Sequence, residues 1–204
     1  SSPSRGLGDV YKRQDLEGTL APEIWKEISK EFNIPELNFS TREIKDFNKL
    51  METRLNSLRN AKIKYSTIRQ FVQTIEVFEG AKDFLKSLKD HYQIVVVSDT
   101  FYQLCEGVIE KLGSPLILCH ELDVVENYIH SYKLRQEYPK KAVVEAFHSL
   151  NFKCYSIGDS YNDIQMIEES GGALIFAPEE VKKEYPNIPS FENYNDLRQH
   201  LLNE

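Results

Sequence analysis

YQIVVVSDT, residues 92–100, indicates the fold of this chain. Its apolar, β-branched centre is typical of a buried strand, and polar residues follow where that strand ends. Residues 101–112 then repeat apolar side chains at helical spacing as far as Gly113, and a second apolar run covers residues 116–119. A strand that leads through a helix into another strand predicts a parallel sheet.

The same alternation continues to the end of the chain. We expect further helices at 81–88, 142–150, 161–169, 178–185 and 194–202, further strands at 153–157 and 173–176, and a small hairpin within 121–134. This order predicts an α/β fold, specifically a Rossmann-like doubly wound parallel sheet. In such sheets the functional site lies outside the carboxyl ends of the strands.

A segment with a purely helical hydrophobic pattern precedes this alternation. Apolar side chains at helical spacing predict one helix around Trp25, a long amphipathic helix from Ile44 to Leu58, and a third helix from Ser66 to Val77. We expect these helices to form a helical cap, residues 21–76, inserted after the first motif. Residues 15–20 and 77–204 then form the core of the protein.

The N-terminal residues 1–14 read SSPSRGLGDVYKRQ and lack the apolar segment of a secretion signal. A central parallel strand is normally a continuous apolar run, yet Lys12, Arg13 and Gln14 stand directly before Asp15. We interpret residues 1–14 as a non-native, adapter-like sequence. The alternative is a native, solvated N-terminal arm.

Composition excludes several classes of function. The formal net charge of −7 argues against a general nucleic-acid binder, which usually carries a basic face. No apolar run approaches the length of about 18 residues that a membrane span requires. Three scattered cysteines, Cys105, Cys119 and Cys154, form no disulfide or metal-binding motif, which is typical of buried thiols in a reducing cytoplasm.

The first candidate functional pair lies in Asp15-Leu16-Glu17-Gly18-Thr19. Side chains two positions apart in a strand point the same way, so both carboxylates face one pocket if a strand ends here. The alternative is an ordinary acidic surface turn. The first interpretation requires other strand ends to supply a phosphate anchor, a cation and a further metal ligand.

Two other strand ends carry suitable polar groups. Ser98-Asp99-Thr100 precedes a helix, where a hydroxyl and free backbone N–H groups can bind an anion or simply cap the helix. Gly158-Asp159-Ser160-Tyr161-Asn162-Asp163 opens another helix, and its carboxylates and amide suit Mg²⁺. Aspartates at a helix start are also favoured by the helix dipole, which is the structural alternative.

A cation is needed to neutralise a transferring phosphoryl group. Lys133, Arg135, Lys140 and Lys141 lie between these two strand ends. Lys140 is favoured because it follows Tyr138-Pro139 at the start of the helix that leads towards Asp159. A solvated surface lysine is the ordinary alternative.

In this order, the Asp15 motif, Ser98, Lys140 and the Asp159 motif resemble the four motifs of the haloacid dehalogenase superfamily. The helical segment after the first motif resembles the cap of its phosphoserine-phosphatase-like branch. Within that branch the chain is most similar to the phosphoserine phosphatase and homoserine phosphotransferase group. The stretches that carry this similarity are 15–25, 98–102, 134–136 and 158–163. The resemblance runs from about residue 15 to the C-terminus.

The resemblance implies a role for each candidate residue. Asp15 attacks phosphorus and forms an aspartyl-phosphate, while Glu17 protonates the leaving oxygen and then deprotonates water. A Mg²⁺ cofactor binds the Asp15 carboxylate, the Glu17 backbone carbonyl and Asp159. The phosphoryl oxygens are held by Ser98, the N–H groups of Asp99 and Thr100, Lys140 and Asn162. Asp163 orients Lys140 or the metal shell.

Two residues of the cap are implied to recognise the amino acid. Glu23 suits the substrate ammonium, and Arg54 suits its carboxylate as a bidentate fork, although each is also explained as a surface ion. Glu17 stands where most of the superfamily has aspartate. Glutamate is the usual residue in the group that this chain resembles, so Glu17 supports that group.

The implied function is a cytoplasmic, Mg²⁺-dependent phosphoserine phosphatase, with phosphoryl transfer to homoserine as a further activity. We expect a small phosphoamino acid as the partner, neither nucleic acid nor membrane, and a monomer or homodimer. One alternative is a phosphatase of another small phosphomonoester, such as a phosphoamine or phosphosugar. The other is an inactive, truncated relic of the fold.

Overall fold

The computed structural model describes residues 10–41, 43–135 and 139–203. Its strands are β1 (Val10–Gln14), β2 (Gln93–Phe101), β3 (Leu116–Val125), β4 (Tyr128–Lys133), β5 (Lys153–Gly158), β6 (Gly172–Ile175) and β7 (Ser190–Phe191). Its helices are α1 (Ile24–Phe32), the 3₁₀ helix η1 (Pro35–Asn38), α2 (Phe47–Asn60), α3 (Tyr65–Val72), α4 (Ala81–Leu88), α5 (Tyr102–Lys111), α6 (Pro139–Ser149), α7 (Tyr161–Ser170), α8 (Glu179–Glu184) and α9 (Tyr194–Asn203).

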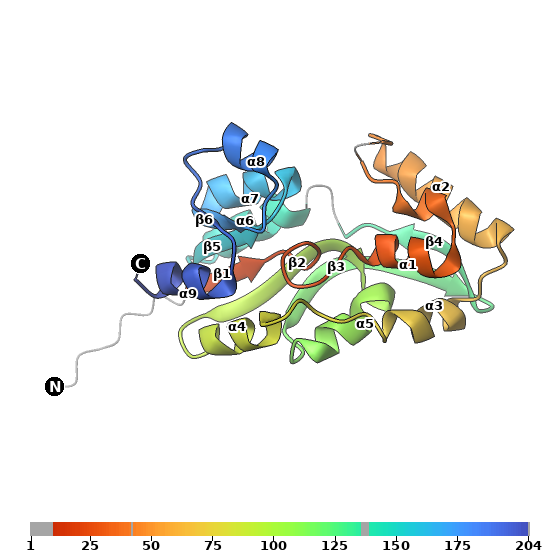
Figure 1. Ribbon diagram of the computed structural model, residues 1–204, viewed down its shortest axis with the longest axis horizontal. Coiled ribbons are helices and arrows are strands. Elements are labelled where there is room, and N and C mark those ends of the chain that lie inside the picture. Colours follow the sequence, from red (N-terminus) through yellow and green to blue (C-terminus); the bar gives the residue numbers. More distant parts are fainter. Residues whose placement is uncertain (1–9, 42, 136–138, 204) are drawn as a thin grey trace.

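The strands of the described chain form a single sheet in the order β4-β3-β2-β1-β5-β6-β7 (Figure 1). Neighbouring strands are parallel, except that β3 and β4 form an antiparallel hairpin. Helices α4 and α5 lie on one side of the sheet in Figure 1, and α6, α7 and α8 lie on the other. The protein therefore has an α/β fold with a mixed, mainly parallel sheet.

The order of the strands reverses at β1. The chain runs outward from β1 through β2, β3 and β4, and then returns to place β5, β6 and β7 on the other side. Ligands of open α/β sheets bind at such a reversal, in the crevice outside the carboxyl ends of the strands. The residues that follow β1, β2 and β5 are therefore the ones that the topology gathers.

Strand β1 consists of residues 10–14, part of the segment interpreted above as adapter-like. Its backbone pairs in parallel with β2 on one side and β5 on the other. Residues 1–9 of that segment lie outside the described part of the chain. The foreign origin of residues 1–14 stays a prediction, but the backbone of residues 10–14 occupies the central position of the sheet.

The helical segment between β1 and β2 contains the three predicted helices. Asn33, with a φ of 51°, ends α1 in the left-handed conformation. Helix α2 starts at Phe47 rather than at Ile44, because the Asp46 side chain accepts the Lys49 N–H at 3.1 Å and caps the helix there. Helix α3 ends at Val72, five residues before the predicted end.

Buried apolar side chains join this segment to the core in one cluster, which includes Ile24 and Trp25 of α1, Leu55 of α2, and Phe101 and Leu104 beside the sheet. Helix α2 packs against β4 and η1, and α3 packs against α5. The helical segment is therefore anchored to the half of the sheet formed by β2, β3 and β4.

One prediction about β2 was wrong. The apolar strand was expected to end at Val97, with Ser98-Asp99-Thr100 leading to a helix that begins near Phe101, but the strand continues through Phe101. Helix α5 begins at Tyr102, and its N-cap residue Phe101 provides no side-chain cap. The hydroxyl of Ser98 is therefore not at the helix N-terminus. The short strand β7 was not predicted.

Candidate active site

Asp15 lies at the tip of β1, where the topology of the sheet changes direction. Its backbone N–H donates to the carbonyl oxygen of Ile157 in β5 at 3.0 Å, which fixes the backbone at this position. The side chain is buried, and Oδ1 accepts the N–H of Leu16 at 2.7 Å. Burial raises the pKa of Asp15 well above its usual value, and the carboxylates of Asp163 and Asp159 raise it further.

Lys140 supplies the cation next to this carboxylate. Its Nζ donates to Asp15 Oδ2 and to Asp163 Oδ1, each at 2.8 Å, and its side chain is buried. Burial disfavours the charge on Lys140, but Asp15 and Asp163 more than offset this, so that the pKa lies well above its usual value. The structure thus brings the predicted lysine into direct contact with residues from two separate strand ends.

Both carboxylate oxygens of Asp163 accept hydrogen bonds. Oδ1 accepts from Lys140, while Oδ2 accepts from the N–H of Asp159 and the N–H and hydroxyl of Ser160 at 3.0–3.1 Å. Together with the Ser160 N-cap this forms a capping box that starts α7. A Cβ at Gly158 would lie 2.3 Å from Asp163, so only glycine allows this close packing. Asp163 is therefore placed to orient Lys140 and the turn that carries Asp159.

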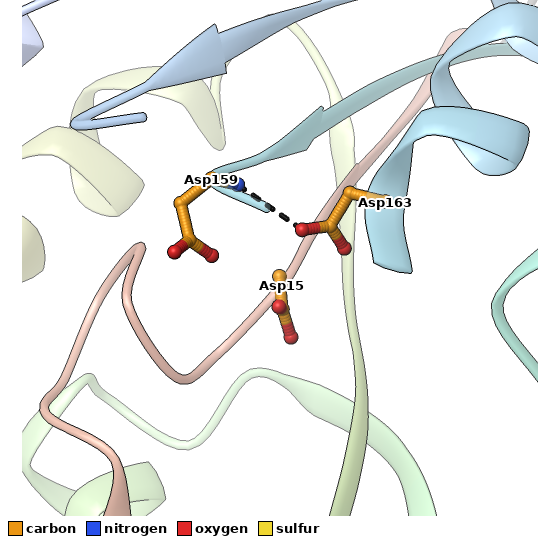
Figure 2. Close-up of side chains that lie close together, drawn as sticks. All are labelled: Asp15, Asp159 and Asp163. Carbon is orange, nitrogen blue, oxygen red and sulfur yellow. Dashed lines mark hydrogen bonds between the residues drawn. The ribbon is translucent and has the colours of Figure 1, made fainter. Parts of the chain in front are cut away.

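Asp159 follows β5 and completes an acidic cluster with Asp15 and Asp163 (Figure 2). Each of the three residues offers a carboxylate oxygen, and these oxygens lie within 4.8 Å of one another. The motif glycine Gly18 has a φ of +79°, and a Cβ there would lie 2.4 Å from Asp159 Oδ2. The glycine therefore allows the loop after β1 to approach the Asp159 carboxylate closely.

The donor set of this cluster fits a divalent metal ion. Burial, followed by the charge of Asp163, raises the pKa of Asp159 to about 7, which indicates that its negative charge is poorly compensated. A bound cation would supply that compensation. Carboxylate oxygens are the ligands that hard cations such as Mg²⁺ prefer. The two oxygens of Asp163 accept four hydrogen bonds between them and those of Asp15 accept two, so Asp15 and Asp159 keep more lone pairs for a metal than Asp163 does.

Glu17 is the second acidic residue of the first motif. Its Oε1 accepts the N–H of Ile24, at the start of α1, at 2.8 Å. Burial raises the pKa of Glu17 to about 7, although the hydrogen bond from Ile24 opposes the shift. A carboxyl group with this pKa can both give and accept a proton near neutral pH.

The two cap residues predicted to recognise the substrate differ in their surroundings. Arg54 lies over the Trp25 ring, 4.8 Å from its centroid, and donates to the carbonyl oxygen of Phe39 at 2.6 Å. Burial lowers the pKa of Arg54 to about 10, and its Nε has no hydrogen-bond partner within the described chain. Glu23 is half exposed and pairs with Lys26 at 2.5 Å. The ring of Trp25 beneath Arg54 was not predicted to be part of the site.

Three further residues predicted to bind phosphate, Ser98, Thr100 and Asn162, form no side-chain hydrogen bond with the acidic cluster within the described chain. Ser98 and Thr100 are buried, and Ser98 Oγ accepts the N–H of Thr100 at 3.3 Å. The Thr100 hydroxyl has no partner among the described residues. Asn162 is exposed on the first turn of α7. Gln136, within the stretch 134–136 that carried part of the resemblance, lies outside the described residues.

A histidine that the sequence did not distinguish lies beside Asp99. His120 is buried in β3, and its Nε2 is 3.9 Å from Asp99 Oδ1. Its Nδ1 accepts the backbone N–H of Arg135 at 3.2 Å. No metal-type spacing drew attention to His120, because its proximity depends on the register between β2 and β3.

Comparisons with known proteins identify similar sequences. The haloacid dehalogenase-like hydrolase family matches residues 15–168. Phosphoserine phosphatase ThrH of Pseudomonas aeruginosa is 38% identical over 190 residues, which cover 92% of this chain and 93% of that protein. A phosphoserine phosphatase of Pseudomonas syringae pv. tomato is 37% identical, with 92% of this chain and 80% of that protein covered.

Solved structures show the same fold at lower sequence identity. The crystal structure of a phosphoserine phosphatase in its apo form has a TM-score of 0.76 and 24% identity, covering 95% of this chain and 97% of that chain. A phosphoserine phosphatase from T. onnurineus has a TM-score of 0.71 and 16% identity, covering 98% of each chain. No helix in the described part of the chain is long and apolar enough to cross a membrane.

Proposed function

Because this chain belongs to the haloacid dehalogenase-like hydrolase family, we propose that it is a Mg²⁺-dependent phosphoserine phosphatase that works through an aspartyl-phosphate. The pairing of Lys140 with Asp15 and Asp163, at 2.8 Å each in a buried site, carries the proposal. It joins a nucleophile, a cation and an orienting carboxylate from separate parts of the chain. The two Pseudomonas phosphoserine phosphatases named above, at 37–38% identity over most of the chain, support the substrate.

In the first step a carboxylate oxygen of Asp15 attacks the phosphorus, and the bond between phosphorus and the serine oxygen breaks. The Glu17 carboxyl, whose pKa lies at about 7, gives its proton to that oxygen, so that neutral serine leaves. Lys140 balances charge beside Asp15 as the phosphoryl group transfers. The product of this step is an acyl phosphate on Asp15.

In the second step water attacks the phosphorus of the aspartyl-phosphate. Glu17, now a carboxylate, takes a proton from the water, and the bond between phosphorus and the Asp15 oxygen breaks to release inorganic phosphate. Asp163 keeps Lys140 directed at the reacting group throughout. Mg²⁺ held by Asp15, Asp159 and the Glu17 backbone carbonyl would neutralise phosphoryl charge and fix the orientation of the group. Ser98, the backbone N–H groups of Asp99 and Thr100, and Asn162 complete the phosphoryl site in this proposal.

The helical segment acts as a cap in this proposal, over a Rossmann-like, doubly wound core. The cap comprises residues 21–76, and the core comprises residues 15–20 and 77–204. The hydrogen bond from Ile24 to Glu17 supports this division, because it ties the first cap helix to the proton-transferring residue. Glu23 and Arg54 then recognise the ammonium and the carboxylate of phosphoserine. An acceptor alcohol such as homoserine could replace water if the cap admits it.

The experiment that tests the function measures phosphate release from phosphoserine, with and without Mg²⁺ and with and without homoserine. We expect Mg²⁺-dependent release that Asp15→Asn abolishes and that the exposed control Asp90→Asn retains. Formation of phosphohomoserine would establish the transfer activity. Absence of Mg²⁺-dependent release from the unaltered chain would contradict the proposal and favour an inactive relic.

A second comparison separates phosphoserine from other small phosphomonoesters. Arg54→Met should raise KM for phosphoserine much more than for phosphoethanolamine, because only phosphoserine has a carboxylate for the guanidinium to bind. Equal losses on the two substrates would contradict the amino-acid specificity and favour a phosphoamine or phosphosugar as the substrate.

A further inference from the structure

An irregular segment of β2 carries Asp99. From Val97, which is paired with Leu118, β2 advances four residues to Phe101, whereas β3 advances only two residues to His120. Asp99 lies in the stretch of β2 between these two pairs, where three residues of β2 stand against one residue of β3. Bulges of this kind redirect side chains, and they are common next to active sites.

The Asp99 carboxylate lies beside the phosphatase site without a hydrogen bond to the described residues. Its Oδ2 is 3.9 Å from Lys140 Nζ, and its Oδ1 is 3.9 Å from His120 Nε2. Both distances are too long for hydrogen bonds. The side chain is 38% exposed, in contrast to the buried carboxylates of Asp15 and Asp163. Asp99 is thus the accessible carboxylate next to the catalytic lysine.

Neither neighbour donates a hydrogen bond to the Asp99 carboxylate. Lys140 already donates to Asp15 and Asp163 at 2.8 Å. Nδ1 of His120 accepts the N–H of Arg135, and burial lowers the pKa of the histidine, so the ring is neutral at pH 7. A cationic ligand group would therefore give Asp99 the charge-assisted hydrogen bond that neither neighbour supplies.

We propose that Asp99 determines substrate specificity by accepting the ammonium group of the phosphoamino acid. The inference rests on the proposed function and adds a carboxylate from the core to Glu23 of the cap. The same Lys140 nitrogen contacts both Asp15 and Asp99. Only two carbon atoms separate the ester oxygen of phosphoserine from its ammonium nitrogen, so the ammonium stays close to the phosphoryl group. Asp99 is an exposed carboxylate beside the lysine that balances the charge of that group.

The test compares phosphoserine with its des-amino analogue, 3-phosphooxypropanoate, which keeps the phosphate and the carboxylate but lacks the ammonium. The unaltered chain should prefer phosphoserine, as measured by the ratio of the two kcat/KM values. Asp99→Asn should reduce this ratio by at least about tenfold, the factor expected when one charge-assisted hydrogen bond is lost. Asp99→Glu, which retains the charge, should keep more of the preference. Asp90→Asn, an exposed control just before β2, should leave the ratio unchanged.

The possible results separate the two proposals. If Asp99→Asn reduces kcat/KM for both substrates by the same factor, or changes neither, Asp99 does not read the ammonium and the inference is overturned while the phosphatase function stands. The same conclusion follows if the unaltered chain hydrolyses both substrates equally well. If the unaltered chain hydrolyses neither, the proposed function fails and the inference fails with it. Thermal unfolding of each variant verifies that it is folded.

Discussion

Asp163→Asn tests how much the buried ion pair between Asp163 and Lys140 contributes to the stability of the protein. The substitution keeps the shape of the side chain but replaces one carboxylate oxygen by an NH₂ group, which can only donate. Asparagine is neutral, so the ion pair with Lys140 at 2.8 Å is lost in either orientation. In addition, the NH₂ faces either Lys140 Nζ or the N–H groups of Asp159 and Ser160. Both orientations bring donors against donors at a site with no solvent exposure.

The expected loss of stability is large. Removing one partner of a buried ion pair typically costs about 3–5 kcal/mol, and we expect the lower end because Lys140 keeps its contact with Asp15. The free energy of unfolding would be measured by denaturant titration in the presence of EDTA, so that metal binding does not contribute. The control Asp123→Asn alters an exposed carboxylate that accepts one hydrogen bond from Ser131, and it should cost less than about 0.5 kcal/mol.

A double-mutant cycle isolates the interaction itself. Lys140→Met alone leaves Asp15 and Asp163 without their cation, so it should also be strongly destabilising. The combined Lys140→Met and Asp163→Asn variant should lose less stability than the two single variants together, by at least about 1 kcal/mol. Additive losses, or an Asp163→Asn variant within about 1 kcal/mol of the unaltered chain, would refute the reasoning.

Three further predictions concern Glu17, Gly18 and Asp159. Burial raises the pKa of Glu17 from 4.5 to about 7, so between these pH values the folded chain keeps a proton that the unfolded chain has lost. The stability of the metal-free protein should therefore fall as pH rises from about 4.5 to 7. Denaturation midpoints measured across this range should depend less on pH for Glu17→Gln. Gly18→Ala should cost about 1–3 kcal/mol from its φ of +79° and more from its contact with Asp159, so it should exceed the loss in Gly113→Ala, where φ is +85° and the nearest atom, Lys89 Nζ, lies 4.0 Å from the new Cβ. Mg²⁺ should raise the Tm of the unaltered chain but raise that of Asp159→Asn much less; equal shifts would place the metal elsewhere.

The fold was largely predictable because its signals are local. The β-branched run of β2 and the apolar stripe of α5 each lie within one element, and the structure confirms the alternation of strands and helices. The two-residue strand β7 could not be predicted, because it exists only through its pairing with β6. The start of α2 was within reach of sequence analysis, since Asp46 is a typical N-cap residue.

Contacts between elements limit how much of the site can be predicted from the sequence. Lys140 could be selected for its position at the start of a helix, and the structure places it between Asp15 and Asp163. The approach of His120 to Asp99 depends on an irregular register between β2 and β3, which no spacing in the sequence reveals. The stacking of Arg54 on Trp25 joins two helices whose relative placement is a matter of tertiary packing.

Strand β1 explains how a polar sequence can precede the nucleophile without displacing it. Residues 11–14 pair with β2 and residues 10–14 with β5 through the backbone, and the Asp15 N–H continues the ladder to Ile157 at 3.0 Å. Backbone pairing does not depend on side-chain identity, so it holds Asp15 at the strand tip whether residues 11–14 are apolar or polar. Side-chain chemistry instead affects the free energy of burying a central strand, which favours apolar residues. Backbone pairing alone therefore accounts for the position of Asp15 at the strand tip behind a polar sequence.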